Sequence, residues 1–218
     1  MIRNRLSELL SERGLKTSRV AKEVSIARSS LTSMIQNENE MIRLDAIDKL
    51  CNYLNIDVAD FFEFSPLVID FTLTKPEIIM SVHHTTSTHL KEMLSFLVLD
   101  CDFLIDININ NDKLVFDCEI TLSEMKFERG RDVLVFEIKD EDSQKKLKSI
   151  INTLTPGLKN MVYKEINKKL ATNFKGAIHN AAYDQLFFPE FTSDEYELVL
   201  SRIKEANFKI KSSIFREY

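Results

Sequence analysis

The stretch VAKEVSIARSSLTSMIQ, residues 20–36, decides how the N-terminal part of the chain folds. If it were one continuous helix, Ile26 would fall out of step with the other apolar side chains. If it is two helices joined by a turn at Ser25 and Ile26, Ile26 can face inward with them. We therefore predict a supporting helix, a tight turn and a second helix from Ala27 to Gln36. The inner face of this pair would consist of Val20, Ala21, Val24, Ile26, Leu31 and Met34.

Helical periodicity continues on both sides of this stretch. Leucines recur at helical spacing over residues 6–10, and a longer apolar stripe covers residues 44–54. The short segment 58–62 adds a last helix with its phenylalanines. Thr17 or Ser18 is suited to cap the supporting helix. Residues 1–65 are thus predicted to form an all-α domain of five short helices.

The periodicity changes at Ser65-Pro66, where we place a domain boundary because proline disfavours a helix at the preceding residue. Apolar and polar residues then alternate over residues 67–73 and 78–82, which predicts a hairpin. Alternation is clearest over residues 103–109 and 114–122, on the two sides of a polar turn. These two segments predict a second hairpin.

Three further segments complete the predicted strands. Residues 133–139 form a strand after a turn at residues 128–131. Residues 90–99 fit either a helix or a strand, and the spacing of their leucines favours a helix. The last ten residues, 209–218, fit an edge strand, a swapped arm or a solvated tail, and the tail is the default.

Helical spacing returns from residue 142 to the end of the chain. Pro156-Gly157 and Gly176 separate the predicted helices, and a final helix covers residues 193–206. Strands followed by helices indicate an α+β domain. We therefore predict that residues 66–218 form an antiparallel sheet and then helices.

Charge is unevenly distributed along the chain, whose net charge is −5. Residues 1–36 contain seven Lys and Arg against three acids, a net charge of +4. Residues 37–65 contain two bases and seven acids, a net charge of −5. A polyanion would therefore bind within the first three dozen residues.

Several function classes find no support in the sequence. No glycine-rich phosphate loop, membrane-length apolar run or secretory signal is present in the 218 residues, so we expect a cytoplasmic protein without a nucleotide cofactor. The cysteines, which have no CxxC spacing, are expected to be buried thiols. They are Cys51, Cys101 and Cys118.

The polar side chains of the second predicted helix are of the types that read DNA. Arg28 can make two hydrogen bonds to guanine, while Ser29, Thr32 and Ser33 can bond to base edges or phosphates. Residues before and after this helix are suited to phosphate contacts. They are Lys16, Thr17 and Arg19 on one side, and Gln36, Asn37, Asn39 and Arg43 on the other.

These features resemble the Cro/phage-repressor (XRE) class of bacterial helix-turn-helix regulators. The resemblance covers LKTSRVAKEVSIARSSLTSMIQNENEMIRLDAIDKLCNYLNIDVADFFEF, residues 15–64. It implies base-reading positions at Arg28, Ser29, Thr32 and Ser33, and phosphate positions at Thr17, Gln36, Asn37 and Arg43. Ser25 stands where the family usually has glycine. A positive φ there would cost serine about 1 kcal/mol.

The resemblance implies a transcription regulator, specifically a repressor, that binds double-stranded DNA. We expect a homodimer, because one short recognition helix gives limited affinity. Residues 66–218 would then supply dimerisation and a possible sensing site, whose effector the sequence does not define. The alternatives are an antitoxin or adaptor that acts through the C-terminal domain, or a helical bundle without a DNA partner. An enzyme is the least favoured class.

Two other clusters contain residues of the types that bind metals or act as acid and base. His83, His84 and His89 could gather a metal with Cys101, Asp102 or Cys118, but adjacent histidines on a strand point to opposite faces. Polar loop residues are the favoured interpretation, so we predict no metal site. The acids Asp106, Asp117 and Glu119 are expected on the solvated face of a sheet rather than in an acid-base pair.

Overall fold

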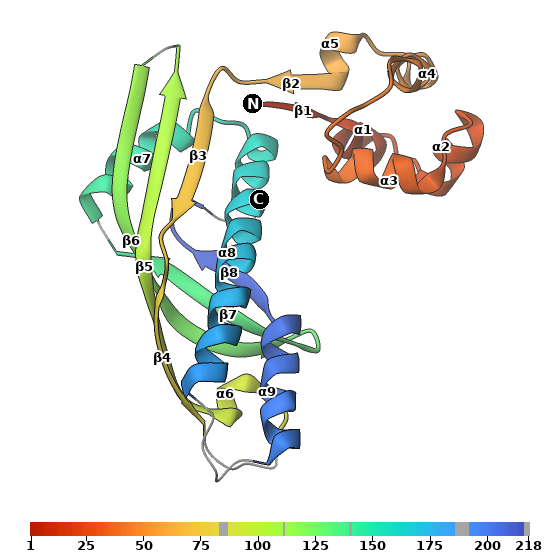
Figure 1. The fold of residues 1–218 in the computed structure, drawn as a ribbon. Helices are drawn as coiled ribbons and strands as arrows, with labels where there is room; N and C mark the ends of the chain where they lie inside the picture. The colour runs from red at the N-terminus through yellow and green to blue at the C-terminus, as the bar shows by residue number, and fades with distance from the viewer. Residues whose placement is uncertain (83–86, 111, 140, 186–191, 216–218) are drawn as a thin grey trace. The chain divides into compact units, whose positions relative to one another are not determined.

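The chain forms two compact units, residues 1–68 and residues 69–218. The sequence-predicted boundary after residue 65 lies close to this division. Figure 1 shows the computed structural model. It describes residues 1–82, 87–110, 112–139, 141–185 and 192–215.

The first unit contains the five predicted helices. They are α1 (Leu6–Glu12), α2 (Thr17–Glu23), α3 (Arg28–Gln36), α4 (Leu44–Leu54) and α5 (Val58–Phe61). Each helix contributes one side chain with no exposed surface to a single shared core. These side chains are Leu6, Val20, Leu31, Leu50 and Phe61.

The first unit is not all-α, which corrects the sequence-based prediction. Strand β1 (Ile2–Asn4) pairs antiparallel with β2 (Phe62–Phe64), and Arg3 lies opposite Glu63. Strands of three residues are too short to show an alternating pattern, and their partners are about 60 positions apart in sequence. This ribbon joins the start of the unit to its end.

The second unit is dominated by a large curled sheet (Figure 1). Its strands follow the order β3-β5-β6-β7-β8, and β4 also pairs with β5. The strands are β3 (Val68–Leu73), β4 (Glu77–Val82), β5 (Leu94–Ile109), β6 (Asp112–Glu128), β7 (Arg131–Ile138) and β8 (Asn207–Lys211).

The hairpin of β5 and β6 is confirmed, with Phe103 opposite Cys118. The turn predicted before β7 is also confirmed, since Arg129 and Gly130 both have positive φ between the paired strands β6 and β7. The first predicted hairpin is wrong. Among the described residues, β3 and β4 both pair with β5 rather than with each other.

The predicted order of an antiparallel sheet followed by helices is wrong in its last step. After the helices the chain returns to the sheet, where β8 runs parallel to β7. The predicted solvated tail is therefore an edge strand followed by the buried side chains of Ile214 and Phe215. The ambiguous segment is divided between the two forms, because α6 (Leu90–Met93) is a single turn that leads directly into β5.

In the described part of the chain, the antiparallel strands are followed by α7 (Glu141–Ile151), α8 (Pro156–Gln185) and α9 (Ser193–Glu205). The prediction that Gly176 separates two helices is wrong, because α8 continues through it. The buried side chains of α8 recur at every fourth position, and each step of four residues rotates by about 40° around a helix. The buried stripe therefore winds around α8 as the sheet curls over it. The stripe consists of Leu158, Val162, Ile166, Leu170, Phe174, Ile178 and Ala182.

Polar side chains of α8 bond to the backbone of the outer strands. Lys169 Nζ donates to the Phe71 carbonyl of β3 at 2.8 Å. The Asn167 side-chain oxygen accepts from the Ile210 N–H of β8 at 2.9 Å. These bonds occupy edge groups that would otherwise be available to another strand.

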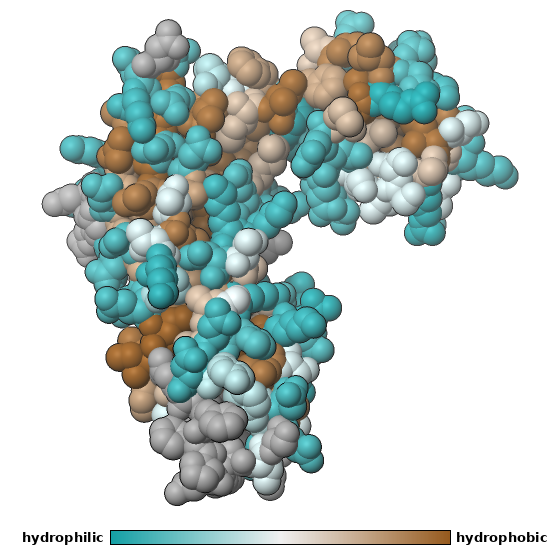
Figure 2. Space-filling model, viewed as in Figure 1, coloured by the Kyte–Doolittle hydropathy of each residue, from teal (hydrophilic) through white to brown (hydrophobic). Residues whose placement is uncertain are grey.

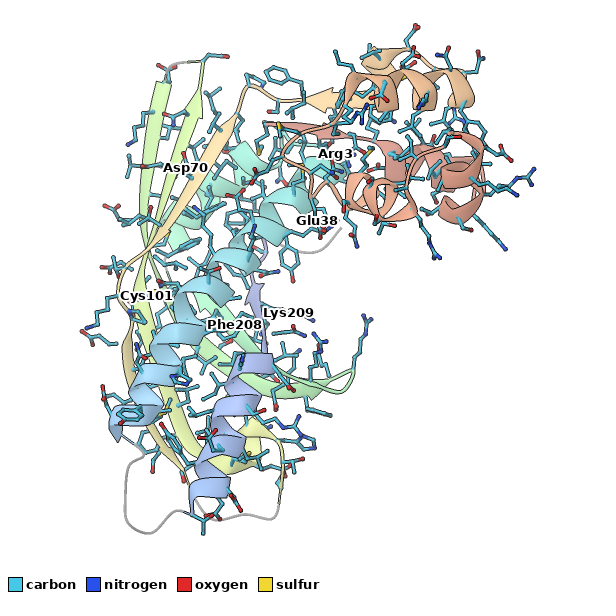
Figure 3. The ribbon with its side chains drawn as sticks, turned by 45° about the vertical axis from the view of Figure 1, so that its right-hand side comes forward. Arg3, Glu38, Asp70, Cys101, Phe208 and Lys209 are labelled. Atoms are coloured by element: carbon cyan, nitrogen blue, oxygen red, sulfur yellow. The ribbon has the colours of Figure 1, made fainter. Side chains whose placement is uncertain are left out.

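Side chains of β8 alternate between the core and the surface, as Figure 3 shows for Phe208 and Lys209. The Phe208 ring stacks with that of Phe136, with 6.0 Å between their centroids, and Phe136 stacks in turn with Phe174 of α8. Lys209 forms an ion pair with Glu128 at 3.2 Å. Strand β8 is therefore held by side-chain contacts on both of its faces.

Replacing Gly176 with alanine should stabilise the protein by about 0.5 to 1 kcal/mol, because glycine is unfavourable inside a helix. An added Cβ would meet no atom within 4 Å. Thermal or denaturant unfolding measures the effect. The matched control is Gly14→Ala, which has the same free space but a φ of +60° and should destabilise. Equal effects of the two variants would contradict the placement of Gly176 inside a helix and of Gly14 in the left-handed region.

Candidate nucleic-acid interface

The turn between α2 and α3 forms with serine in the position that favours glycine. Ser25 has a φ of 53°, in the left-handed region. The next residue closes the turn, because the Ile26 N–H donates to the Ala21 carbonyl at 3.0 Å. Ile26 is partly buried against the core, so the two-helix interpretation of residues 20–36 is confirmed.

A buried seam holds α3 on α2. Val20, Ala21 and Val24 face the core from the supporting helix, and Leu31 and Met34 face it from α3. All five side chains are less than a tenth exposed. The opposite side of α3 is therefore left to solvent.

The predicted base-reading residues lie on that solvent side. Arg28 and Ser29 are exposed at the first turn of α3, while Thr32 and Ser33 are half-buried one turn later. Residues four apart lie on the same side of a helix, so these side chains form one surface. Figure 2 shows it as a pale and teal area of small polar and charged residues. The Thr32 hydroxyl donates to the Arg28 carbonyl at 2.8 Å and keeps its lone pairs for other donors.

The start of α2 differs in detail from the prediction. Lys16 is the N-cap residue and makes no side-chain capping bond, so the prediction of Thr17 or Ser18 as the cap is wrong. Thr17 is instead the first helical residue and is half-buried. Lys16 and Arg19 are exposed on the same short helix.

Arg19 is exposed but already has a partner. Its Nε donates to Glu23 at 2.8 Å, one turn further along α2. Hydrogen bonds from Arg19 and from Tyr53 hold the pKa of the Glu23 carboxyl below its ordinary value. Exposed pairs of this kind contribute little to stability, so a phosphate can compete for Arg19.

The phosphate positions predicted after α3 are in different situations. Gln36 is exposed at the last turn of α3. Arg43 is also exposed, and its guanidinium makes two bonds to Asp45, at 2.9 and 3.3 Å. Asn37 is half-buried, and its side chain bonds to the backbone of Asn4 in β1. The structure thus brings Asn37 to the core side, whereas Gln36 and Arg43 remain at the surface.

Two relevant residues were missing from the predicted site. Lys22 is exposed one turn after Arg19 and adds a cation to this surface. The charge count over residues 1–36 was the signal that could have included it. Asn4 lies 33 positions before its partner Asn37, and nothing in the local sequence pattern indicates that contact.

The histidine cluster offers no metal site in the part of the chain that the structure describes. His83 and His84 lie outside the described residues. The ring of His89 lies against that of Phe127, with 3.9 Å between their centroids.

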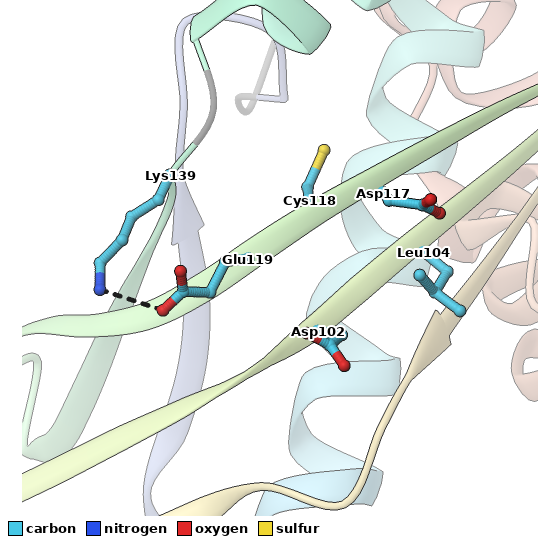
Figure 4. A pocket seen from close by; sticks show the side chains of 6 residues that line it. All are labelled: Asp102, Leu104, Asp117, Cys118, Glu119 and Lys139. Atoms are coloured by element: carbon cyan, nitrogen blue, oxygen red, sulfur yellow. Dashed lines mark hydrogen bonds and ion pairs between the residues drawn. The ribbon is translucent and has the colours of Figure 1, made fainter.

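A shallow pocket lies on β5 and β6 of the second unit (Figure 4). Its acidic side chains are Asp102, Asp117 and Glu119, and Lys139 forms an ion pair with Glu119 at 3.2 Å. Burial raises the pKa of the nearby Cys101 thiol to about 12, and the carboxylates beside it add to the shift. This thiol is therefore protonated at neutral pH.

A helix pair with a buried seam, a sharp turn and a polar outer face on its second helix defines a helix-turn-helix DNA-binding domain. Comparison with known protein families agrees, because residues 5–66 match the family described as the Cro/C1-type HTH DNA-binding domain. The N-terminal unit is therefore a Cro/C1-type domain, and the resemblance drawn from the sequence is confirmed. Neither the curated proteins nor the solved structures gave a match.

The presence of this domain supports the general conclusion that the protein is a DNA-binding transcription regulator. Among the described residues, we found no helix with the length and apolar character needed to cross a bilayer.

Replacing Ser25 with glycine should stabilise the protein by about 1 kcal/mol, because glycine adopts a φ of 53° without strain. The measurement is the free energy of unfolding. The matched control is Ser30→Gly in the middle of α3, where glycine should instead destabilise. If Ser25→Gly destabilised as much as the control, Ser25 would not be in the left-handed region.

Proposed function

We propose that the protein is a sequence-specific repressor that reads double-stranded DNA with α3. The observation that supports this proposal is the exposed polar face of α3, whose opposite face is buried in the seam with α2. In this proposal Arg28, Ser29, Thr32 and Ser33 contact base edges in the major groove. Thr17, Arg19, Gln36 and Arg43 contact the phosphates on the two sides, and Lys22 adds a further phosphate contact.

The charges of the first unit support this orientation on DNA. Four exposed cations lie on α2, α3 or directly before α2, namely Lys16, Arg19, Lys22 and Arg28. Four exposed acids lie on α4, α5 or directly before α5, namely Asp45, Asp48, Asp57 and Asp60. With the exposed acid Glu23 the first region keeps a net charge of +3, and with the exposed cations Arg43 and Lys49 the second keeps −2. Phosphates would attract the first region more strongly, so α2 and α3 would approach the duplex first.

We further propose that the protein acts as a homodimer in the cytoplasm and is not an enzyme. A reading helix of nine residues contacts few base pairs. Two copies on half-sites about 34 Å apart would supply the affinity and specificity of a regulator. In this proposal the second unit holds the two copies together and is the place where an effector would act.

The test is selection of duplexes from a random pool with the full chain, followed by binding assays at several salt concentrations. We expect an enriched inverted repeat with half-site centres about 10 base pairs apart. We also expect affinity to fall steeply with salt, because several phosphates are neutralised. Light scattering should give the mass of a dimer. The absence of any enriched sequence would contradict sequence-specific binding.

Replacing Arg28 with alanine should cost about 1 to 3 kcal/mol on the selected duplex, because a two-bond contact to guanine is lost. Specificity should relax at one base pair in each half-site and stay unchanged elsewhere. Repeating the selection with the variant measures this. Lys49→Ala, which removes a cation on α4, is the matched control and should keep the original sequence preference. An unchanged preference in Arg28→Ala would refute this role of α3.

Replacing Glu23 with glutamine should strengthen binding to any duplex by roughly threefold, because it removes a negative charge beside the phosphates and frees Arg19. The gain should shrink at high salt. Asp48→Gln on α4 removes the same charge further from the proposed interface and should have little effect. Equal gains from both variants would mean that net charge alone, and not the position of α2, governs binding.

A further inference from the structure

A buried asparagine connects the N-terminal strand to the end of the recognition helix. Asn4 is only 2% exposed, although its amide is polar. Its side-chain nitrogen donates to the Met34 carbonyl in the last turn of α3 at 2.8 Å. Its side-chain oxygen accepts from the Leu6 N–H at the start of α1 at 3.1 Å. One side chain therefore bonds to two helices.

Asn37 returns the contact from the other side. It is the C-cap of α3 and has a left-handed backbone with a φ of 55°. Its side-chain oxygen accepts from the Asn4 N–H at 2.8 Å, and its side-chain nitrogen donates to the Asn4 carbonyl at 3.0 Å. We call the two side chains and their bonds to β1 and α3 the Asn4–Asn37 clamp.

The strand that carries Asn4 is itself held firmly. Arg3, labelled in Figure 3, is 9% exposed. It forms ion pairs with Glu8 of α1 and Glu63 of β2. On the other side of Asn4, the Arg5 N–H donates to the Phe61 carbonyl at 2.8 Å. The last turn of α3 is therefore linked through Asn4 to both the first helix and the last segment of the domain.

We propose that Asn4 and Asn37 are positioning residues for DNA reading, which fix where the end of α3 lies in the groove. This inference rests on the proposed function. The turn at Ser25 holds only the first end of α3, so without the clamp the end of the helix is held only by apolar contacts, those of Leu31, Met34 and the partly buried Ile35. Removing the hydrogen bonds of a buried side-chain amide leaves unsatisfied polar groups, and this favours movement of the helix end.

The clamp also assigns Asn37 a different role from phosphate binding. Its amide oxygen and one amide hydrogen are already bonded to β1. A positioning residue and a phosphate ligand differ in what their loss changes. Movement of α3 weakens binding to the selected duplex only, whereas loss of a phosphate contact weakens binding to every duplex.

The test uses the full chain and the variants Asn37→Gly and Asn4→Ala. Glycine at position 37 keeps the left-handed backbone and removes only the amide. The matched control is Asn55→Gly, since Asn55 is also a left-handed C-cap, with a φ of 52° at the end of α4, and its side chain is exposed. Affinity is measured for the selected duplex and for a random duplex.

We expect Asn37→Gly and Asn4→Ala to weaken binding to the selected duplex by about tenfold and to change binding to the random duplex by less than twofold. Asn55→Gly should change neither. The double variant should be weaker than either single variant, because the Asn4 side chain bonds to Met34 and Leu6 while the Asn37 side chain bonds separately to the backbone of residue 4. Equal losses on both duplexes, or a double variant no weaker than Asn4→Ala alone, would overturn the inference.

Hydrogen exchange without DNA keeps this test separate from that of the proposed function. The amide of Glu38, which bonds to the Ser33 carbonyl, should exchange at least tenfold faster in Asn37→Gly than in Asn55→Gly. If the parent protein selects no duplex, the proposed function fails, and with it the role in reading. Unchanged exchange in Asn37→Gly would overturn the clamp even if the parent protein binds DNA.

Discussion

The two ends of α3 are held by different kinds of interaction, and the surface offered to DNA depends on both. The left-handed backbone at Ser25 sets the direction in which α3 leaves α2. At the other end, the amides of Asn4 and Asn37 bond to each other's strand and helix. Between these points Leu31 and Met34 fix the rotation of the helix about its axis. Direction, end point and rotation together determine which side chains face outward.

The second unit is subject to a different constraint, because the edge strands of its long curled sheet have unpaired backbone groups that must be covered or bonded. Its 30-residue helix α8 buries a stripe that winds with the curl, so one helix covers strands that run in different directions. Lys169 and Asn167 of the same helix bond to the outer strands β3 and β8. One element thus supplies both the core contacts and the protection of the edges.

Local patterns were sufficient to predict most of the first unit. The stripe around Ile26 required a turn, and the structure has one there even though serine replaces the usual glycine. The ribbon of β1 and β2 was beyond such reasoning, because it depends on residues about 60 positions apart. The Asn4–Asn37 clamp escaped prediction for the same reason. Asparagine in a polar loop also gives no sign that its side chain is buried.

In the second unit, alternation predicted the individual strands better than their partners. The hairpin of β5 and β6 has continuous alternation on both sides of a short turn, and it formed as expected. Residues 67–82 show the same alternation, yet β3 and β4 both lie along β5, which is long enough to pair with each in turn. For residues 209–218 a tail is the default and an edge strand only an alternative, because the partner of β8, strand β7, is about 75 residues away in sequence.

The proposal that the exposed face of α3 reads DNA is tested most directly by NMR. The backbone amide resonances of the full chain are followed as the selected duplex is added. The largest shifts should fall on Lys16 to Lys22, on Arg28 to Gln36 and on Arg43, with small shifts within the acidic helices α4 and α5. Shifts concentrated on α4 and α5, or in the second unit, would contradict the assignment of α3 as the reading helix.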